Sequence, residues 1–355
     1  MNTKREYENR SWMKFNHPAV FALLLLLPVA AWAGGVVTNC TEADLRAAMA
    51  GGGTVTFACD GTIHLSNTIT IVGDTRLDGS GRQVVISGTV AITQAVRVFY
   101  VNTNVNFTVV NLTIDDGSIM GGGGGGAIFN HGGTVNASYC SFGGNTTWAP
   151  VPYDYQYAVY GGAIRNEAGQ VNLRSCAFGG NRASGGSGFG GAIHNSGTVT
   201  LDLCTFTGNS ATGGNGFDMW PFNGPGGPGG EGSGAAIFNQ GTLTVDRTTF
   251  YGNTATGGAG GGGGRPPSSG SNLDGYPGGA GGEAHGGAIC NLGSCWVTRS
   301  TFASNVVTSG AGGTGGAANR SGMNMAGTGA AAGMQAPGLV GRCSTAGERD
   351  SSTVP

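Results

Sequence analysis

Few side chains in this sequence are placed to do acid–base chemistry, and one adjacent pair of carboxylates stands out, Asp115 and Asp116. Hydrolysis of a glycosidic bond needs two carboxylates on one groove, and calcium-dependent lyases need an acidic cluster with a basic residue. Gly117 follows the pair, and Asp-Asp-Gly is a composition typical of a turn. We therefore interpret the pair as turn residues. A catalytic or calcium-binding role would require Asp78 to converge with them on one face.

The histidines and lysines suggest no further catalytic chemistry. His64, His131, His194 and His285 are scattered without the spacing of metal ligands, so we predict neither a metal site nor a cofactor. Lysine is absent after Lys14, which removes lysine-dependent chemistry from the rest of the chain. We assign no catalytic residue and expect a non-enzymatic protein rather than an enzyme.

The charge of the chain narrows the choice of partners. It carries 17 basic and 19 acidic residues, a formal net charge of −2, spread thinly over 355 residues. Binding of nucleic acid or of anionic lipid depends on a clustered basic surface. We therefore expect no nucleic-acid partner.

Aromatic residues crowd two segments and are the best candidates for a binding surface. Aromatic side chains on loops can stack on a sugar ring or cover the apolar patch of a cell-surface protein. The alternative is that each segment packs back on the structure beneath it. The candidate binding residues are Trp148, Tyr153, Tyr155 and Tyr157 in the first segment and Phe217 and Trp220 in the second.

The elements that must position these residues repeat five times. Each repeat pairs a Gly-Gly-Ala-Ile-x-Asn element, once with Ala in place of the second Gly, with a Phe-x-x-Asn element. The first element begins at Gly125, Gly161, Gly190, Gly234 and Gly286. The second begins at Phe142, Phe178, Phe206, Phe250 and Phe302. Self-similarity at a period of 20–50 residues marks a repeat architecture with one supersecondary unit per repeat.

Periodicity within a repeat indicates short strands. In the second repeat Val171 and Leu173 stand seven and five residues before Phe178, and the spacing of two is that of a strand. Cys176 breaks this parity, which predicts a bend between two strands, and Ile164 marks a third strand. Three short strands per repeat predict an all-β fold, one coil of a right-handed parallel β-helix. Equivalent Ile, Phe and Asn residues then stack in ladders, with each Asn amide bonded to its neighbour.

The N-terminal segments predict export and a capped solenoid. Residues 1–33 combine a basic start, an apolar run and Ala31-Trp32-Ala33, the pattern of a cleaved signal peptide, so we expect a secreted or cell-surface protein without a membrane span after cleavage. Thr41-Glu42-Ala43-Asp44 predicts the start of a short helix that covers the first coil. Cys40 and Cys59 flank this helix and the first strand, so we predict a disulfide between them.

Three domains follow from these patterns: a signal peptide (1–33), a β-helix (34–319) and a disordered or truncated tail (320–355). The segments between Phe-x-x-Asn and the next repeat vary in length, and the long glycine-rich ones are expected to be mobile. Cys140, Cys176 and Cys204 share one ladder position and are expected in the core. Cys290 and Cys295 are close enough in sequence to close a small loop.

The paired repeat resembles the signature of the polymorphic outer-membrane proteins of chlamydiae, whose secreted passengers are β-helices. The opening of the chain, from Cys40 through Gly53-Thr54-Val55 to Leu77-Asp78-Gly79, resembles the start of many secreted right-handed β-helix proteins of bacteria. Together the two resemblances span about residues 36–320. They imply a single-stranded solenoid with the pectin-lyase type of fold and a role in adhesion at the outer membrane or cell surface.

The sequence therefore leads us to consider two functions. The first is a secreted, non-enzymatic adhesion or interaction module whose partner is a glycan or a host or cell-surface protein. The second is a polysaccharide-acting enzyme, because the same fold includes pectate lyases and polygalacturonases. The sparse carboxylates and the absence of lysine favour the first function.

Overall fold

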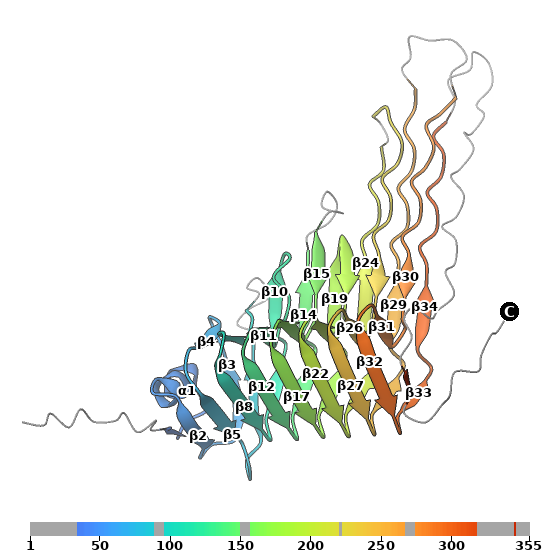
Figure 1. Ribbon diagram of the computed structural model, residues 1–355. Coiled ribbons are helices and arrows are strands. Elements are labelled where there is room, and N and C mark those ends of the chain that lie inside the picture. The colour runs from blue at the N-terminus through green and yellow to red at the C-terminus, as the bar shows by residue number, and fades with distance from the viewer. Residues whose placement is uncertain are drawn as a thin grey trace, which may run out of the picture. The chain divides into compact units, whose positions relative to one another are not determined.

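The computed structural model describes residues 34–88, 96–149, 157–219, 222–266 and 274–317, together with the backbone of Ser344–Thr345. The expected signal peptide and all of the expected tail except Ser344–Thr345 lie outside the described residues. The single α-helix of the described part, α1, spans Glu42–Met49, and strands make up nearly half of the rest (Figure 1).

Three parallel sheets form the walls of a right-handed parallel β-helix, as the sequence predicts. The ten-stranded sheet contains β1 (Val36–Val37), β2 (Gly53–Phe57), β5 (Thr75–Asp78), β8 (Asn106–Val110), β12 (Thr134–Ser138), β17 (Gln170–Arg174), β22 (Thr198–Asp202), β27 (Thr242–Asp246), β32 (Ser294–Thr298) and β35 (Ser344–Thr345). The eight-stranded sheet contains β3 (Gly61–His64), β6 (Val84–Ser87), β9 (Thr113–Asp115), β13 (Ser141–Gly143), β18 (Ala177–Gly179), β23 (Thr205–Thr207), β28 (Thr249–Tyr251) and β33 (Thr301–Ala303). The seven-stranded sheet contains β4 (Ile69–Ile71), β7 (Phe99–Val101), β11 (Ile128–His131), β16 (Ile164–Glu167), β21 (Ile193–Asn195), β26 (Ile237–Asn239) and β31 (Ile289–Asn291).

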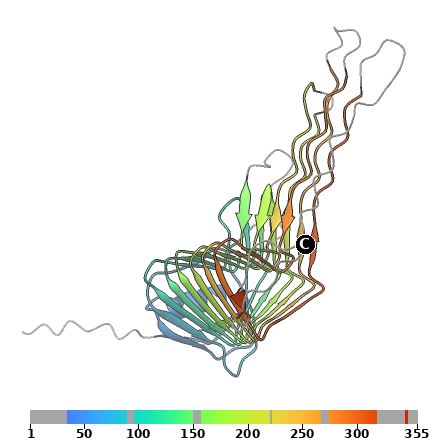
Figure 2. The ribbon, with the colours of Figure 1, turned by 45° about the vertical axis from the view of Figure 1, so that its right-hand side comes forward.

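Two further parallel sheets, which we call the fin, project from one corner of the coils (Figures 1 and 2). The outgoing fin sheet contains β10 (Ser118–Met120), β14 (Thr146–Trp148), β19 (Arg182–Gly185), β24 (Ser210–Gly213), β29 (Thr254–Thr256) and β34 (Val306–Thr308). The returning fin sheet contains β15 (Ala158–Tyr160), β20 (Ser187–Phe189), β25 (Gly232–Ser233) and β30 (Ala284–His285). A coil of the later repeats therefore has five strands rather than the three that the sequence predicts.

Residues with left-handed backbone conformation turn each corner. The bend that the parity break predicts lies three residues before each Phe, at Tyr139, Ser175, Leu203, Arg247 and Arg299, where φ is between 48° and 56°. The first Gly of each Gly-Gly-Ala-Ile element turns the chain from the fin into the seven-stranded sheet, with φ of 57° at Gly161 and 72° at Gly190. Glycine adopts this conformation without the steric cost that a β-carbon adds.

Ladders of identical residues fill the solenoid in register. Ile128, Ile164, Ile193 and Ile237 are fully buried, as are the stacked rings of Phe142, Phe178, Phe206 and Phe250. The centroids of neighbouring rings lie 4.6–4.9 Å apart, close to the strand spacing. The prediction of one buried Ile ladder beside a Phe ladder is thus confirmed, except that Phe302 in the last coil is 46% exposed and Ile289 is only partly buried.

Two ladders of asparagine side chains form hydrogen bonds at the buried corners of the coils. Each amide nitrogen in the first ladder donates to the side-chain oxygen of the next Asn, for example Asn166 to Asn195 at 2.8 Å and Asn195 to Asn239 at 2.7 Å. The second ladder repeats this pattern from Asn145 to Asn305 with distances of 2.8–3.0 Å. Buried amides cost free energy unless they are bonded, so the ladders fix both the position of the corner and the register of the coils.

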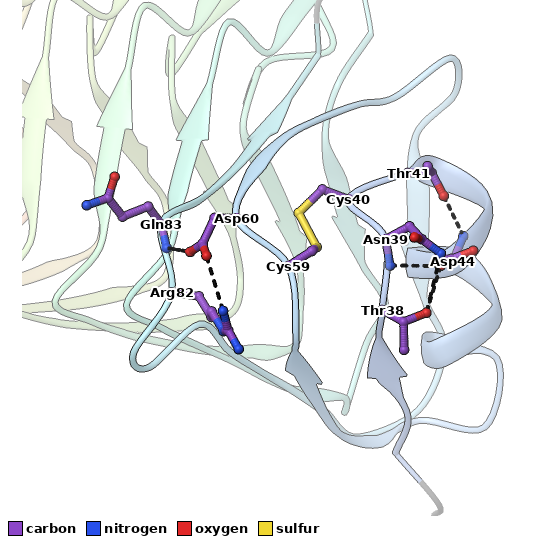
Figure 3. The surroundings of a disulfide bond; sticks show 9 residues. All are labelled: Thr38, Asn39, Cys40, Thr41, Asp44, Cys59, Asp60, Arg82 and Gln83. Atoms are coloured by element: carbon purple, nitrogen blue, oxygen red, sulfur yellow. Dashed lines mark hydrogen bonds and ion pairs between the residues drawn. A yellow bond between two sulfur atoms is a disulfide. The ribbon is translucent and has the colours of Figure 1, made fainter.

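The N-terminal cap forms as the sequence predicts (Figure 3). The hydroxyl of Thr41 accepts a hydrogen bond from the backbone nitrogen of Asp44 at 3.2 Å, and the buried Leu45 packs α1 onto the core. The predicted disulfide joins Cys40 to Cys59, whose Cα atoms lie 5.7 Å apart. The helix therefore covers the first coil and is tied to it covalently.

The opening coils depart from the strand pattern of the sequence at one place. The stretch 107–114, which reads as one strand, is two strands, β8 and β9, separated by a left-handed residue, Asn111. A single left-handed residue redirects the chain here without any glycine to mark the corner.

The glycine-rich segments that extend the fin are hydrogen-bonded to one another in their described residues, whereas the sequence predicts mobile loops. Gly258, Gly261 and Gly264 donate to the carbonyl oxygens of Gly230, Gly227 and Gly224 at 2.8–2.9 Å. Bonds between two β-strands recur every second residue, whereas these recur every third, which is the period of a polyproline II helix. The segments form two hydrogen-bonded layers, an outgoing one (213–219, 257–266, 309–317) and a returning one (224–232, 274–283).

Candidate binding surfaces

The candidate Trp148 lies on the outgoing fin sheet beside an apolar residue that sequence analysis missed. Trp148 ends β14 and is 37% exposed, while Thr147 before it is buried. In the parallel register its neighbour on β10 is Met120, which is 56% exposed. Residue 120 falls outside both aromatic segments, and only the stacking of the coils brings it next to Trp148.

Tyr157 lies on the returning leg of the same fin repeat, just before β15 leads back to the corner at Gly161. Its side chain is 50% exposed and directly precedes β15, which contacts β14. We call these three exposed side chains the fin patch: Met120 and Trp148 are neighbours on the outgoing fin sheet, and Tyr157 lies on the returning leg. Tyr153 and Tyr155, which stand between Trp148 and Tyr157 in the sequence, lie outside the described residues.

The second candidate segment is only partly visible. The ring of Phe217 lies over Gly227, where an added β-carbon would come within 2.4 Å of the ring, and the side chain is half-buried. For Phe217 the alternative that the segment packs back on its own structure is therefore favoured. Trp220 lies outside the described residues, and Phe222 beyond it is 69% exposed.

A row of aromatic and cationic side chains fills the angle between the seven-stranded sheet and the fin. Arg165 lies over the rings of Phe129 and Tyr160, at 5.0 and 4.9 Å from their centroids. Tyr160 stacks on Phe189 with the ring centroids 5.7 Å apart. These contacts join the base of the fin to the solenoid wall. The sequence signal for them was the variable position of Gly-Gly-Ala-Ile-x-Asn, which carries Phe129 and Arg165.

His194 occupies the same variable position and is buried, which corrects the expectation that it points out to solvent. Its side chain leaves the solenoid interior, but Tyr160 and Phe238 enclose it, and the residue is 4% exposed. Neither ring nitrogen has a hydrogen-bond partner. Burial, followed by the nearby charge of Arg165, lowers the pKa of His194 to about 3. The imidazole is therefore neutral and contributes to packing.

The candidate carboxylates do not converge on one face. Asp115 ends β9 in the eight-stranded sheet and is followed by Asp116 in the left-handed conformation of a turn. Asp78 lies in the ten-stranded sheet, where it pairs with Arg76 at 2.8 Å. Burial and the neighbouring Asp116 raise the pKa of Asp115, whereas hydrogen bonds from Ser80 and Arg76 outweigh burial and lower that of Asp78. Among the described residues no group of His, Cys, Asp or Glu is arranged to hold a metal ion.

The cysteines of the repeats are structural. Cys140, Cys176 and Cys204 are buried free thiols in one ladder, as predicted, and contact with Cys140 raises the pKa of Cys176. A disulfide between Cys290 and Cys295, which the sequence allows, does not form. Cys290 is a free thiol, and Cys295 is in a disulfide with another residue. Burial, together with the charge of Glu231, raises the pKa of Cys290 to about 12, so it is a poor nucleophile.

Comparison with known proteins adds no family assignment. A scan against models of known protein families finds no match, and neither does a search of curated proteins. Within the described residues no helix is long and apolar enough to cross a membrane.

Proposed function

We propose that this protein is a secreted or cell-surface interaction module that binds a glycan or a cell-surface protein through the fin patch. The observation that carries the proposal is the exposure of Met120, Trp148 and Tyr157 on one projecting element. Exposed apolar side chains that cluster on a soluble surface are typical of binding sites. Export follows from the signal-peptide pattern of residues 1–33.

The fin suits this role because it presents the patch on a rigid support. Backbone pairing of β14 with β10 and β19 fixes the position of Trp148 before any partner arrives. A preorganised surface loses less conformational entropy on binding than a mobile loop, so more of the contact free energy appears as affinity. The alternative of a polysaccharide-acting enzyme has no observation in its favour among the described residues, whose candidate carboxylates lie apart.

The test compares the parent protein with the double variant Trp148→Ala, Tyr157→Ala in binding to cultured cells and to a glycan array. Tyr251→Ala is the matched control, because Tyr251 is 53% exposed on the eight-stranded sheet, away from the fin. We expect the double variant to bind at least about tenfold more weakly with an unchanged melting temperature, and the control to bind as the parent does. Equal binding by the parent and the double variant would remove the fin patch as the binding site.

A further inference from the structure

The outer face of the ten-stranded sheet carries two columns of uncharged side chains over six consecutive strands, from β8 to β32. The parallel register aligns equivalent residues of successive strands, which lie ~4.8 Å apart. One column contains Asn106, Thr134, Gln170, Thr198, Thr242 and Ser294. The other contains Thr108, Asn136, Asn172, Thr200, Thr244 and Trp296. We call the two columns the polar strip.

The middle of the polar strip is hollowed. A shallow depression of about 280 Å³ lies over β12, β17 and β22. Ala137 and Leu173 line it together with polar and charged residues, among them Asn136, Asn172, Thr200 and Asp202. The face is therefore shallowly hollowed over these three strands.

Hydrogen-bonding groups in the strip remain available to a ligand. The amide nitrogen of Asn172 donates to the side-chain oxygen of Asn136 at 2.9 Å, and Gln170 donates to Asn172 at 3.1 Å. This chain of amides fixes their orientation and leaves the nitrogen of Asn136 free to donate. Among the described residues the hydroxyls of Thr200 and Thr244 have no partner, so each can both donate and accept.

Charged residues border the strip but neutralise one another. Asp202 lies between Arg174, at 3.5 Å, and Arg247, at 2.5 Å. Asp246 lies between Arg247, at 3.2 Å, and Arg299. Charge-assisted pairs of this kind hold the planar carboxylate and guanidinium groups in fixed orientations. The border therefore supplies directional contacts without a strong field of one sign.

We propose that the polar strip binds an extended, uncharged polysaccharide chain, laid along the solenoid axis across β12, β17, β22, β27 and β32. A ligand rich in hydroxyls matches amide and hydroxyl side chains that can donate and accept. The strand spacing is close to the advance per sugar of an extended β-linked chain, so successive sugars meet equivalent side chains. Trp296, 46% exposed at one end of the strip, supplies an aromatic ring for a sugar face.

The composition of the strip disfavours other partners. Protein interfaces draw most of their affinity from Trp, Tyr and Arg, and Ser and Thr are under-represented there. Nucleic acid needs an excess of Arg and Lys along the contact, and here each Asp of the border is paired with Arg. A repeating neutral ligand gains affinity instead from many weak equivalent contacts made at once.

The proposal rests on the proposed role as a secreted binding protein, but it concerns a surface separate from the fin patch. Its test measures retention of the full secreted chain on microcrystalline cellulose and on chitin, with polygalacturonate as the charged comparison. The test variant is Thr198→Val, Thr200→Val on β22. The matched control is Thr205→Val, Thr207→Val on β23, because these threonines belong to the same coil but are exposed on the eight-stranded sheet.

We expect the parent to bind cellulose or chitin with little dependence on salt, and to bind polygalacturonate more weakly. The β22 variant should lose at least about tenfold in affinity, the consequence of removing two hydrogen-bonding groups, while the β23 variant should bind as the parent does. Failure of the parent to bind either neutral polymer, or equal binding by the two variants, would overturn the proposal that the polar strip binds polysaccharide.

The fin double variant separates this proposal from the proposed function. If the double variant Trp148→Ala, Tyr157→Ala abolishes polysaccharide binding and the β22 variant does not, the polysaccharide binds at the fin patch and not at the polar strip. If cell binding persists without any polysaccharide binding, only the strip fails. If the parent binds neither cells, glycan array nor polysaccharide, both proposals fail.

Discussion

The imidazole of His194 meets the ring of Tyr160 edge-on, with the ring centroids 4.7 Å apart and the planes inclined by 68°. Tyr160 belongs to the returning fin sheet and His194 to the seven-stranded sheet of the next coil, so the contact joins the fin to the solenoid wall. Both ring nitrogens of His194 are buried without a partner. A charge on this ring would therefore have to be accommodated at the joint between the two parts of the fold.

The first prediction is a loss of stability in mild acid that depends on His194. Its pKa is lowered to about 3 in the folded protein by burial and by Arg165, from 6.5 in a free side chain. The unfolded chain therefore binds the proton first as the pH falls. The contribution of the neutral ring is complete above pH 6.5 and is lost between pH 6.5 and pH 3, by up to about 1.4 kcal/mol per pH unit.

Two substitutions separate titration of His194 from its packing. His194→Phe places at this position the residue found at Phe129 and Phe238, and His194→Gln keeps a polar group there. Denaturant unfolding at neutral pH and at about pH 5 should show a reduced pH dependence in both variants, because the ionised carboxylates with lowered pKa values protonate in more acidic solution. The Gln variant should be the less stable of the two. An unchanged pH dependence in both variants would mean that another group is responsible.

The second prediction concerns the Phe ladder. Phe206 is fully buried and stacks on Phe178 and Phe250, so Phe206→Ala should cost ~3–5 kcal/mol of unfolding free energy. Phe302→Ala is the matched control, since among the described residues Phe302 stacks on Phe250 alone and it is 46% exposed. Its cost should be less than half as large. Equal losses of unfolding free energy in the two variants, measured by chemical denaturation, would show that burial does not control the stability of the ladder.

The third prediction concerns the direction of the hydrogen bonds in the asparagine ladder. Asn195 accepts from Asn166 at 2.8 Å and donates to the side-chain oxygen of Asn239 at 2.7 Å. Asn195→Ala should cost ~2–4 kcal/mol because it leaves buried partners unbonded. Asn195→Asp should cost more, since a buried carboxylate faces the oxygen of Asn239 and has no proton to donate. Thermal unfolding of the three proteins ranks them, and an Asp variant as stable as the parent would refute the assigned ladder.

The solenoid could be predicted from the sequence because its side chains repeat in register. Val171 and Leu173 mark a strand by their spacing of two, and the step to Cys176 locates the corner that Ser175 turns. These are properties of the local chain and do not depend on distant contacts. The disulfide of Cys40 and Cys59 followed for the same reason, since both cysteines flank a helix and strand that are visible in the sequence.

The fin and the binding surfaces could not be predicted from the sequence in the same way. Glycine at every third position marks polyproline II chains, but between Gly257 and Gly264 the intervening residues are also mostly glycine and hide the period. The fin patch depends on Met120 lying beside Trp148, which only the register of β10 with β14 determines. The burial of His194 likewise depends on Tyr160 and Phe238, which belong to neighbouring coils.

The last prediction tests whether the glycine-rich segments of the fin are packed chains. The backbone nitrogen of Gly261 donates to Gly227 and its carbonyl oxygen accepts from Gly279, both at 2.8 Å, so Gly261 lies between two neighbouring chains. A β-carbon at Gly261 would lie 1.9 Å from the carbonyl oxygen of Phe217, a distance that the packed backbone cannot accommodate. Gly261→Ala should therefore separate the chains of the fin locally.

Gly262→Ala is the control, because the nearest atom to its added β-carbon is the flexible carboxylate of Asp218 at 3.3 Å. Amide hydrogen exchange of the backbone nitrogens in residues 226–232 and 257–264 should accelerate at least about tenfold in the Gly261 variant and change little in the Gly262 variant. The amides of the solenoid walls should keep the protection of the parent in both variants, since the ladders do not depend on the fin glycines. Rapid exchange of these fin amides in the parent, or equal exchange in the two variants, would mean that the segments are mobile and that the three-residue hydrogen bonding does not persist in solution.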